Sequence, residues 1–250
     1  MCPVSSVPVS PSPLHAVARL RAARLAVSSK PFVARGANLQ RCTGCRLPPS
    51  HCICAWRPSR SARAGFCLLM GDIEALKPTN TGWLIADVVP DTWAFAWSRT
   101  GVDPALLALL RDPQWQPLVV FPPEYAAPSR VVAAPPPAQD AAGRRPLYVL
   151  LDGTWSEARK MFRKSPYLDA APVLGLHPGH TSRYRLRRSA QEHHFCTAEI
   201  AAMCLDLAGD AVAAEALDAW FGLFSEHYLS ARGHQPLLQD SEALRRLRAA

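Results

Sequence analysis

The stretch Leu147-Tyr148-Val149-Leu150-Leu151-Asp152-Gly153-Thr154-Trp155 decides how this chain folds. Its first five residues form a continuous apolar run, which is typical of a strand buried on both faces of a sheet. The sequence after it changes to helical spacing, so we predict a strand over 147–151 and a helix over 154–164. Ligands of parallel α/β sheets bind at the carboxyl ends of the strands. The junction at 152–155 is therefore the first place to look for chemistry.

The rest of the chain repeats this alternation of strand-like and helix-like segments, which indicates the α/β class. The segment 122–146 is dominated by Pro and Ala and is expected to be a surface loop. Composition divides the chain into a flexible basic tail, a cysteine module, a main domain and a C-terminal extension, with bounds 1–38, 39–62, 63–230 and 231–250. Further strands are expected at 66–70, 93–97, 118–121 and 172–176, and further helices at 14–25, 82–89, 104–110, 197–207, 210–228 and 241–249.

The net charge of +8 is concentrated at the start of the chain. Residues 1–71 contain ten Lys and Arg residues, and Asp72 is the first acidic residue. A basic arm suits a polyanion such as nucleic acid, whereas a solvated, disordered tail is the alternative interpretation. The Arg- and Ser-rich start is also similar to an organelle transit peptide. No apolar run reaches 18 residues, so we expect no membrane span and a cytosolic protein.

Four cysteines lie within thirteen residues, in the pattern Cys42-x2-Cys45-x6-Cys52-x-Cys54. Thiolates bind zinc strongly and four-cysteine sites are closed and structural, so we predict a tetrahedral zinc site. Disulfides are an alternative, but no secretory signal indicates an oxidising compartment. A redox pair fits less well, because it normally opens a helix and needs no second pair. The other cysteines are expected to be bystanders, namely Cys2 and the buried Cys67, Cys196 and Cys204.

Basic side chains and an indole surround this cluster: Arg41, Arg46, Arg57, Arg60 and Trp56. Such a set is suited to binding RNA by phosphate contact and base stacking. A cysteine change here is expected to affect stability or RNA binding more than chemistry.

The junction after the apolar run also fits a purely structural interpretation. Thr154-Trp155-Ser156-Glu157 has the pattern of a capping box, in which the Thr hydroxyl accepts a backbone N–H and Glu157 reaches back. Asp152 would then complement the positive end of the helix, and Trp155 would belong to the core. The four residues alone do not separate the two interpretations.

Three further polar clusters accompany this junction, at 74–81, 182–188 and 192–199. In this order, and after the four cysteines, the set resembles the DTW-domain family of tRNA-uridine aminocarboxypropyltransferases, whose signature is Asp-x-Thr-Trp. The resemblance covers about 41–228. Asp91-Thr92-Trp93 spells the family's name but precedes a predicted strand, so no site is expected there. His193 and His194 depart from the family pattern, and surface hydrogen bonding is the favoured interpretation for them.

Members of this family transfer the 3-amino-3-carboxypropyl group of S-adenosylmethionine to N3 of a tRNA uridine and release methylthioadenosine. The resemblance implies tRNA and S-adenosylmethionine as partners, and a SPOUT-like, mostly parallel sheet with flanking helices and a deep knot near the cofactor. It implies catalytic roles for Asp152, Thr154 and Trp155. It implies binding of the donor by Asn80, Thr81, Asp152, Arg183, Tyr184, Arg187, Thr197 and Glu199.

Uracil N3 becomes a good nucleophile only when it loses its proton, which makes Asp152 a candidate base; its carboxylate can equally hold the donor's ammonium or ribose hydroxyls. Arg183 or Arg187 can pair with the transferred carboxylate, and Trp155 can stack on adenine or uracil. The basic residues of helix 154–164 provide either a positive surface for tRNA or a solvated face. An RNA methyltransferase and a zinc-stabilised RNA-binding module without catalysis are the two alternative functions.

Overall fold

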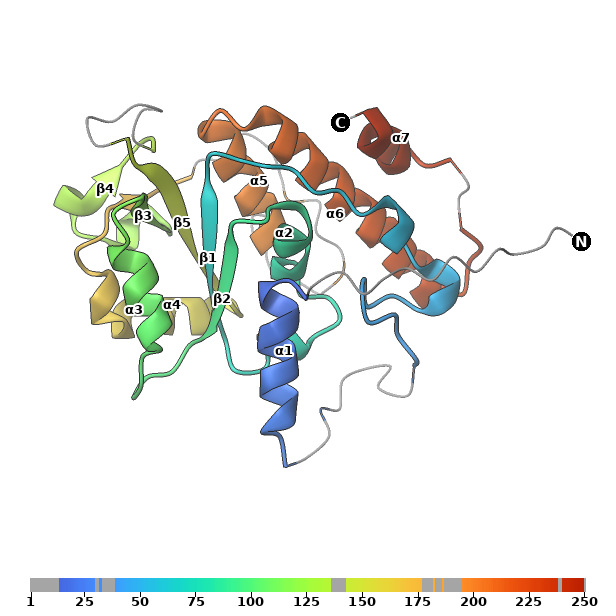
Figure 1. Cartoon of the computed structure of the whole chain (residues 1–250), viewed down its shortest axis with the longest axis horizontal. Helices are drawn as coiled ribbons and strands as arrows, with labels where there is room; N and C mark the ends of the chain where they lie inside the picture. The colour runs from blue at the N-terminus through green and yellow to red at the C-terminus, as the bar shows by residue number, and fades with distance from the viewer. Residues whose placement is uncertain are drawn as a thin grey trace, which may run out of the picture.

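The computed structural model describes residues 14–29, 32, 39–135, 143–176, 182, 186, 195–237 and 240–249 (Figure 1). Within these residues, six parallel strands form a central sheet in the order β2-β1-β5-β3-β6-β4. The α/β class and the mostly parallel sheet predicted from the sequence are therefore confirmed. The strands are β1 (Gly65–Met70), β2 (Thr92–Ala96), β3 (Trp115–Val120), β4 (Val131–Val132), β5 (Arg145–Asp152) and β6 (Val173–Leu174).

Helices cover both faces of the sheet, and Figure 1 shows the two groups on opposite sides of the strands. One face carries α2 (Gly82–Val88), α5 (Thr197–Leu207) and α6 (Ala211–Arg232). The other carries α3 (Pro104–Arg111) and α4 (Trp155–Lys164). Two peripheral helices, α1 (Ala16–Ala26) and α7 (Glu242–Ala249), pack against β2 and α6. Single 3₁₀ turns are formed at Pro49–His51, Cys54–Trp56, Glu74–Leu76, Pro123–Tyr125, Pro128–Arg130 and Pro166–Leu168.

Side chains along β5 alternate between two hydrophobic cores, as the period of a strand requires. Tyr148 and Leu150 face the core formed with α2, α5 and α6, whereas Leu147 and Val149 face the core formed with α3 and α4. Asp152 continues the first series. The fold therefore directs its side chain toward the face that α2 and α5 cover.

Three segments differ from the sequence prediction. The segment 1–38 was expected to be a flexible tail, yet α1 lies within it, at the place of the expected short helix, and Val17 is fully buried. The Pro- and Ala-rich segment was expected to be a loop throughout, but β4 pairs with β6 there. A two-residue strand is too short for its alternation to be recognised in a sequence. The cysteine module is not separate from the main domain, because Leu47 and Ile53 are fully buried in the same core as α6.

None of the helices in the described part of the chain combines the length and the apolar character that crossing a bilayer requires.

A buried polar cluster around Asp87 fastens α1 to the domain. The Asp87 carboxylate accepts a hydrogen bond from Trp220 Nε1 at 3.1 Å and lies 3.2 Å from Arg57 Nε and 3.5 Å from His15 Nε2. Burial raises the pKa of Asp87 to about 7, although Arg57 and the hydrogen bond from Trp220 oppose this shift. Burial also lowers the pKa of His15 to about 3, so its imidazole is neutral at pH 7. His15 Nδ1 accepts the N–H of Ala18, which leaves the proton on the Nε2 that faces Asp87.

Replacing Asp87 by Ala should lower the free energy of unfolding by about 3 kcal/mol, because the buried indole N–H of Trp220 loses its acceptor and the half-buried guanidinium of Arg57 loses its ion-pair partner. Urea unfolding followed by circular dichroism measures this change. Asp72→Ala is the matched control, since that carboxylate pairs with Arg24 of α1 at the surface and 68% of its side chain is exposed. Equal effects of the two substitutions would contradict the assignment of Asp87 as the buried anchor of α1.

Candidate functional site

The Asp152 carboxylate is held from two sides at the carboxyl end of β5. Its Oδ2 accepts a hydrogen bond from the side-chain amide of Asn80 at 2.7 Å, and its Oδ1 accepts one from the hydroxyl of Thr197 at 2.8 Å. Only 4% of the residue is exposed. Asn80 precedes α2 and Thr197 begins α5, so three segments distant in sequence meet at one carboxylate. A carboxylate fixed in this way needs little reorganisation when a ligand arrives.

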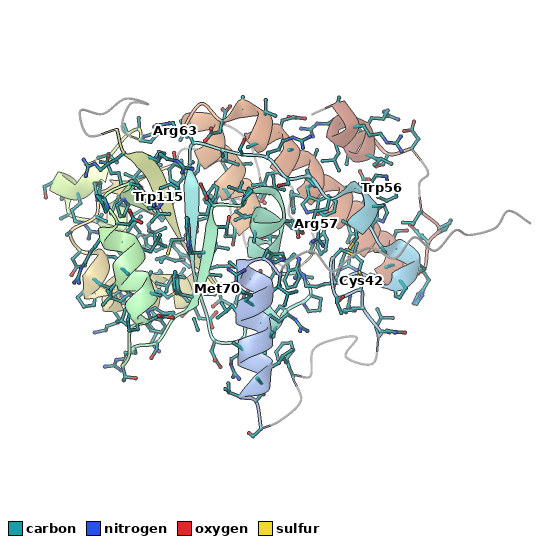
Figure 2. All side chains as sticks on the ribbon, viewed as in Figure 1. Cys42, Trp56, Arg57, Arg63, Met70 and Trp115 are labelled. Atoms are coloured by element: carbon teal, nitrogen blue, oxygen red, sulfur yellow. The ribbon has the colours of Figure 1, made fainter. Side chains whose placement is uncertain are left out.

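Strand pairing at the carboxyl end of β5 also fixes the backbone at this site. Met70, labelled in Figure 2, pairs in register with Asp152, and the next N–H along the chain, that of Gly71, donates to the Asp152 carbonyl at 2.9 Å. Helix α2 approaches so closely that a Cβ on Gly82 would lie 2.6 Å from Asp152 Oδ2. A side chain at position 82 would therefore displace either α2 or the carboxylate.

The loop before α2 contains a second buried carboxylate, that of Glu74, which forms an ion pair with Lys77. Asn80 Nδ2 lies 3.5 Å from Glu74 Oε1, so the Asn80 amide group faces two carboxylates. Its Oδ1 accepts the N–H of Trp83 at 3.0 Å in the first turn of α2. These contacts set which end of the Asn80 amide faces Asp152.

The first turn of α5 holds Thr197 in place through Glu199. Glu199 Oε2 accepts the N–H of Cys196 and the hydroxyl of Ser182, each at 2.8 Å. Thr81 Oγ1 accepts the N–H of Ala198 at 3.4 Å, which ties the loop before α2 to the same turn. Of the predicted donor-binding residues, the structure therefore brings Asn80, Thr81, Thr197 and Glu199 together with Asp152.

The junction after β5 forms the predicted capping box. Thr154 Oγ1 accepts the N–H of Glu157 at 3.3 Å, and Glu157 Oε2 accepts the N–H of Thr154 at 2.8 Å. The Thr154 hydroxyl also donates to Glu157 Oε2 at 2.6 Å. Thr154 thus has a clear structural role, whereas Asp152 points away from this cap toward α2 and α5.

Trp155 does not belong to the core, because 40% of it is exposed. Its ring stacks on Phe121, with ring centroids 5.5 Å apart and planes 12° apart. Tyr125, 38% exposed, meets Trp155 edge-on at 5.8 Å, and the Arg159 guanidinium lies 5.2 Å over the Tyr125 ring. We call Phe121, Tyr125 and Trp155 the aromatic platform. Phe121 and Tyr125 follow β3, which runs parallel to β5. The aromatic platform therefore lies at the carboxyl ends of the strands, at the same end of the sheet as Asp152.

The four cysteines converge with the geometry of a metal site. Their sulfurs all lie within 4.8 Å of one another, and the separations are 3.6 Å for Cys42–Cys54, 3.6 Å for Cys42–Cys52 and 3.8 Å for Cys45–Cys52. Tetrahedral zinc with bonds of about 2.3 Å requires sulfurs about 3.8 Å apart. A disulfide requires about 2.05 Å, so the disulfide alternative does not hold. The cluster is compatible with zinc and lies beside α6, where Figure 2 labels Cys42.

A family model described as the DTW domain matches residues 39–229. The chain belongs to the DTW-domain family. The matched region starts just before the four cysteines and ends inside α6, so the four-cysteine cluster and Asp152 lie in one DTW domain. Membership is consistent with a role in tRNA modification. Among solved structures, none matches the chain.

The contiguous Asp91-Thr92-Trp93 sequence lies at the amino ends of the strands, opposite the end where Asp152 lies. Asp91 precedes β2, and its carbonyl accepts the N–H of Phe66 at 2.9 Å. Its carboxylate forms an ion pair with Arg145, the first residue of β5. Asp91 is thus a structural residue at the amino ends of the strands, away from the site around Asp152.

Two of the arginines expected to bind RNA contact other parts of the DTW domain. Arg46 is 4% exposed, so the prediction of an RNA contact is wrong for this side chain. Arg57 pairs with the buried Asp87 while 28% of its side chain is exposed, and its RNA contact stays a prediction. Their neighbours in sequence are cysteines, and local composition does not reveal partners that lie in other segments.

Cys2 lies outside the described residues, and so do five predicted residues of the segment after β6: Arg183, Tyr184, Arg187, His193 and His194. These five residues precede α5. Their roles, and the knot implied by the family resemblance, stay predictions.

The aromatic partners of Trp155 and the role of Gly82 were not predicted from the sequence. Phe121 and Tyr125 follow β3, and the rule that ligands meet the carboxyl ends of parallel strands could have drawn attention to them. The role of Gly82 depends on a distance across the fold that no local pattern encodes.

Proposed function

We propose that this DTW domain transfers the 3-amino-3-carboxypropyl group of S-adenosylmethionine to N3 of a tRNA uridine. Family membership supports the substrate class. The observation that carries the proposal is the Asp152 carboxylate, fixed by Asn80 and Thr197 at the carboxyl end of a central parallel strand. Sites at that end of a sheet are where α/β proteins bind their ligands.

The reaction is a displacement at a carbon attached to the donor sulfonium. Uracil N3 loses its proton and attacks the methylene carbon next to sulfur, the new N–C bond forms, and the C–S bond breaks. The electron pair of that bond stays on sulfur, which leaves as the neutral thioether of methylthioadenosine. A sulfonium has three carbon substituents, so the carbon presented in line with N3 determines the product.

Asp152 is the proposed catalytic residue and serves in one of two ways. It accepts the N3 proton, or it holds the ammonium or ribose hydroxyls of the donor. Asn80 and Thr197 position it. Thr81 and Glu199 hold the surrounding turns. We retain Arg183, Tyr184 and Arg187 as proposed donor-binding residues, with Arg183 or Arg187 paired to the transferred carboxylate.

Mass spectrometry of nucleosides from tRNA incubated with the protein and S-adenosylmethionine tests this function. The expected product is 3-(3-amino-3-carboxypropyl)uridine, together with methylthioadenosine. Formation of S-adenosylhomocysteine with a methylated nucleoside would identify an RNA methyltransferase instead. Binding of tRNA without any new nucleoside would identify a non-catalytic RNA-binding module.

The surface beside the site supports RNA as the substrate. Helix α4 exposes Arg159, Lys160, Arg163 and Lys164, and none of them pairs with a carboxylate among the residues that the structure describes. Cations of this kind neutralise phosphates. The aromatic platform adjoins them and is suited to stacking with a nucleobase of the tRNA.

Replacing Trp155 by Ala should weaken tRNA binding about 5- to 100-fold, because stacking on an aromatic side chain contributes that much per base. Fluorescence anisotropy with labelled tRNA measures the change. Trp155→Phe keeps a flat ring on Phe121 and should retain most of the affinity. Unchanged tRNA affinity together with weaker S-adenosylmethionine binding would instead assign Trp155 to the adenine of the donor.

A further inference from the structure

We infer that Arg46, which lies inside the cysteine module, is a positioning residue for Asp152. The four-cysteine site and the carboxylate are then structurally coupled. The inference concerns the site of the proposed function. Its structural part can be tested without any enzymatic assay.

Arg46 lies in a tight turn that the first two cysteines close. Its N–H donates to the carbonyl of Cys42 at 2.8 Å, and the N–H of Cys42 donates to the carbonyl of Leu47 at 2.8 Å. Its φ of 64° lies in the left-handed region, which is unfavourable for a residue with a long side chain. Such a backbone persists only where the surroundings hold it, and here the two hydrogen bonds close the turn while Cys42 and Cys45 belong to the four-cysteine cluster that is compatible with zinc.

The turn directs the Arg46 side chain into the domain, onto the loop before α2. Nη1 donates to the carbonyl of Lys77 at 3.0 Å, and Nη2 donates to the carbonyl of Asn80 at 2.9 Å. The guanidinium lies 4.4 Å over the ring of Trp83 and 5.5 Å from that of Phe224. One planar cation therefore fixes both ends of a short loop segment, which the single ammonium of a lysine does less well.

The segment that Arg46 holds ends in the residue that contacts Asp152. Asn80 Nδ2 donates to Asp152 Oδ2 at 2.7 Å. A second contact from the cysteine module acts on the next turn, because the indole N–H of Trp83 donates to the carbonyl of Gly44 at 3.1 Å. A continuous path of hydrogen bonds thus leads from the cysteine turn through Asn80 to the carboxylate.

This path of hydrogen bonds predicts that loss of the metal affects catalysis as well as stability. From the sequence, a cysteine change was expected to affect mainly stability and RNA binding. Because the cysteine turn holds the Asn80 carbonyl, loosening it should also displace Asp152 and lower the rate of the chemical step.

Arg46→Lys and Arg46→Met test the inference, with Arg111→Met as the matched control. Arg111 is an exposed arginine at the end of α3, near the amino ends of the strands and away from Asp152. Metal content, hydrogen exchange of a peptide covering 77–84 and the kinetic constants are measured for each protein. A peptide covering β5 reports on global opening.

In the two Arg46 variants, exchange at 77–84 should become about tenfold faster or more, while the β5 peptide stays protected. The value of kcat/KM for the donor should fall about 10- to 100-fold with KM for tRNA within about twofold, because the change displaces Asp152 and leaves the RNA-binding surface intact. Arg46→Lys should be the milder variant. Arg111→Met should match the wild type in every measurement.

Chelation of the metal from the wild-type protein should reproduce the faster exchange at 77–84. If exchange at 77–84 stays at the wild-type rate in Arg46→Lys and after chelation, or rises equally in the β5 peptide, the inference is wrong. If the wild-type protein forms no modified uridine, the proposed function fails, and the exchange measurements still decide the role of Arg46.

Discussion

Asp152→Asn should reduce formation of the modified uridine by about 100- to 10,000-fold, the range in which positioned proton transfer contributes to catalysis. The substitution keeps the size of the side chain but removes its charge. It also turns one oxygen into an N–H donor, and both Asn80 and Thr197 already donate to this side chain. A mismatch of two donors costs about 1–3 kcal/mol, so the stability of the variant must be measured beside its activity.

Asp210→Asn is the matched control for this experiment. The Asp210 carboxylate also accepts two hydrogen bonds, from the N–H groups of Arg63 at 2.8 Å and Ala64 at 2.9 Å. It does so at the amino end of β1, at the opposite edge of the sheet from Asp152. The control should lose a similar amount of stability and keep its activity. Wild-type activity in Asp152→Asn would eliminate the proposed role of this carboxylate.

Calorimetric titration with S-adenosylmethionine separates the two proposed roles of Asp152. If the carboxylate removes the N3 proton, Asp152→Asn should bind the donor with unchanged Kd and lose kcat. If it holds the ammonium or the ribose hydroxyls, the Kd for the donor should rise, because a charge-assisted contact is lost.

The parts of this fold that the sequence predicts are those with local signals. Continuous apolar runs marked β1 and β5, and the end of β5 marked the place of Asp152. The spacing of the four cysteines predicted a cluster that the structure confirms. Each of these signals lies within a short window of the chain, where periodicity or ligand spacing is directly visible.

The parts that the sequence did not predict depend on contacts between distant segments. Arg46 is surrounded by residues typical of an RNA-binding knuckle, yet its guanidinium partners are the carbonyls of Lys77 and Asn80, 31 and 34 residues away. Similarly, α1 is held through His15 by Asp87, a residue of α2. Composition describes the neighbours of a residue in sequence, and neither of these contacts is made with such a neighbour.

Cys45→Ser should release the metal and lower the Tm of the domain by at least about 6–12 °C. Binding of a structural metal contributes directly to folding, and we expect its loss to cost at least as much as breaking a buried ion pair, about 3 kcal/mol. Each kcal/mol shifts the Tm of a chain of this size by about 2–4 °C. The loss of metal should destabilise the whole domain, because Leu47 and Ile53 lie in the core shared with α6. Inductively coupled plasma mass spectrometry of the purified protein measures the zinc content per chain, and differential scanning calorimetry measures the Tm.

Cys204→Ser is the matched control, because this cysteine is also buried but lies in α5, outside the cluster. It should keep one zinc per chain and lose less stability, since only a thiol in an apolar core is changed. Absence of zinc from wild-type protein purified with zinc present would contradict the metal assignment. A Cys45→Ser variant with the Tm of the wild type would show that the buried side chains of the module, rather than the metal, hold it on the domain.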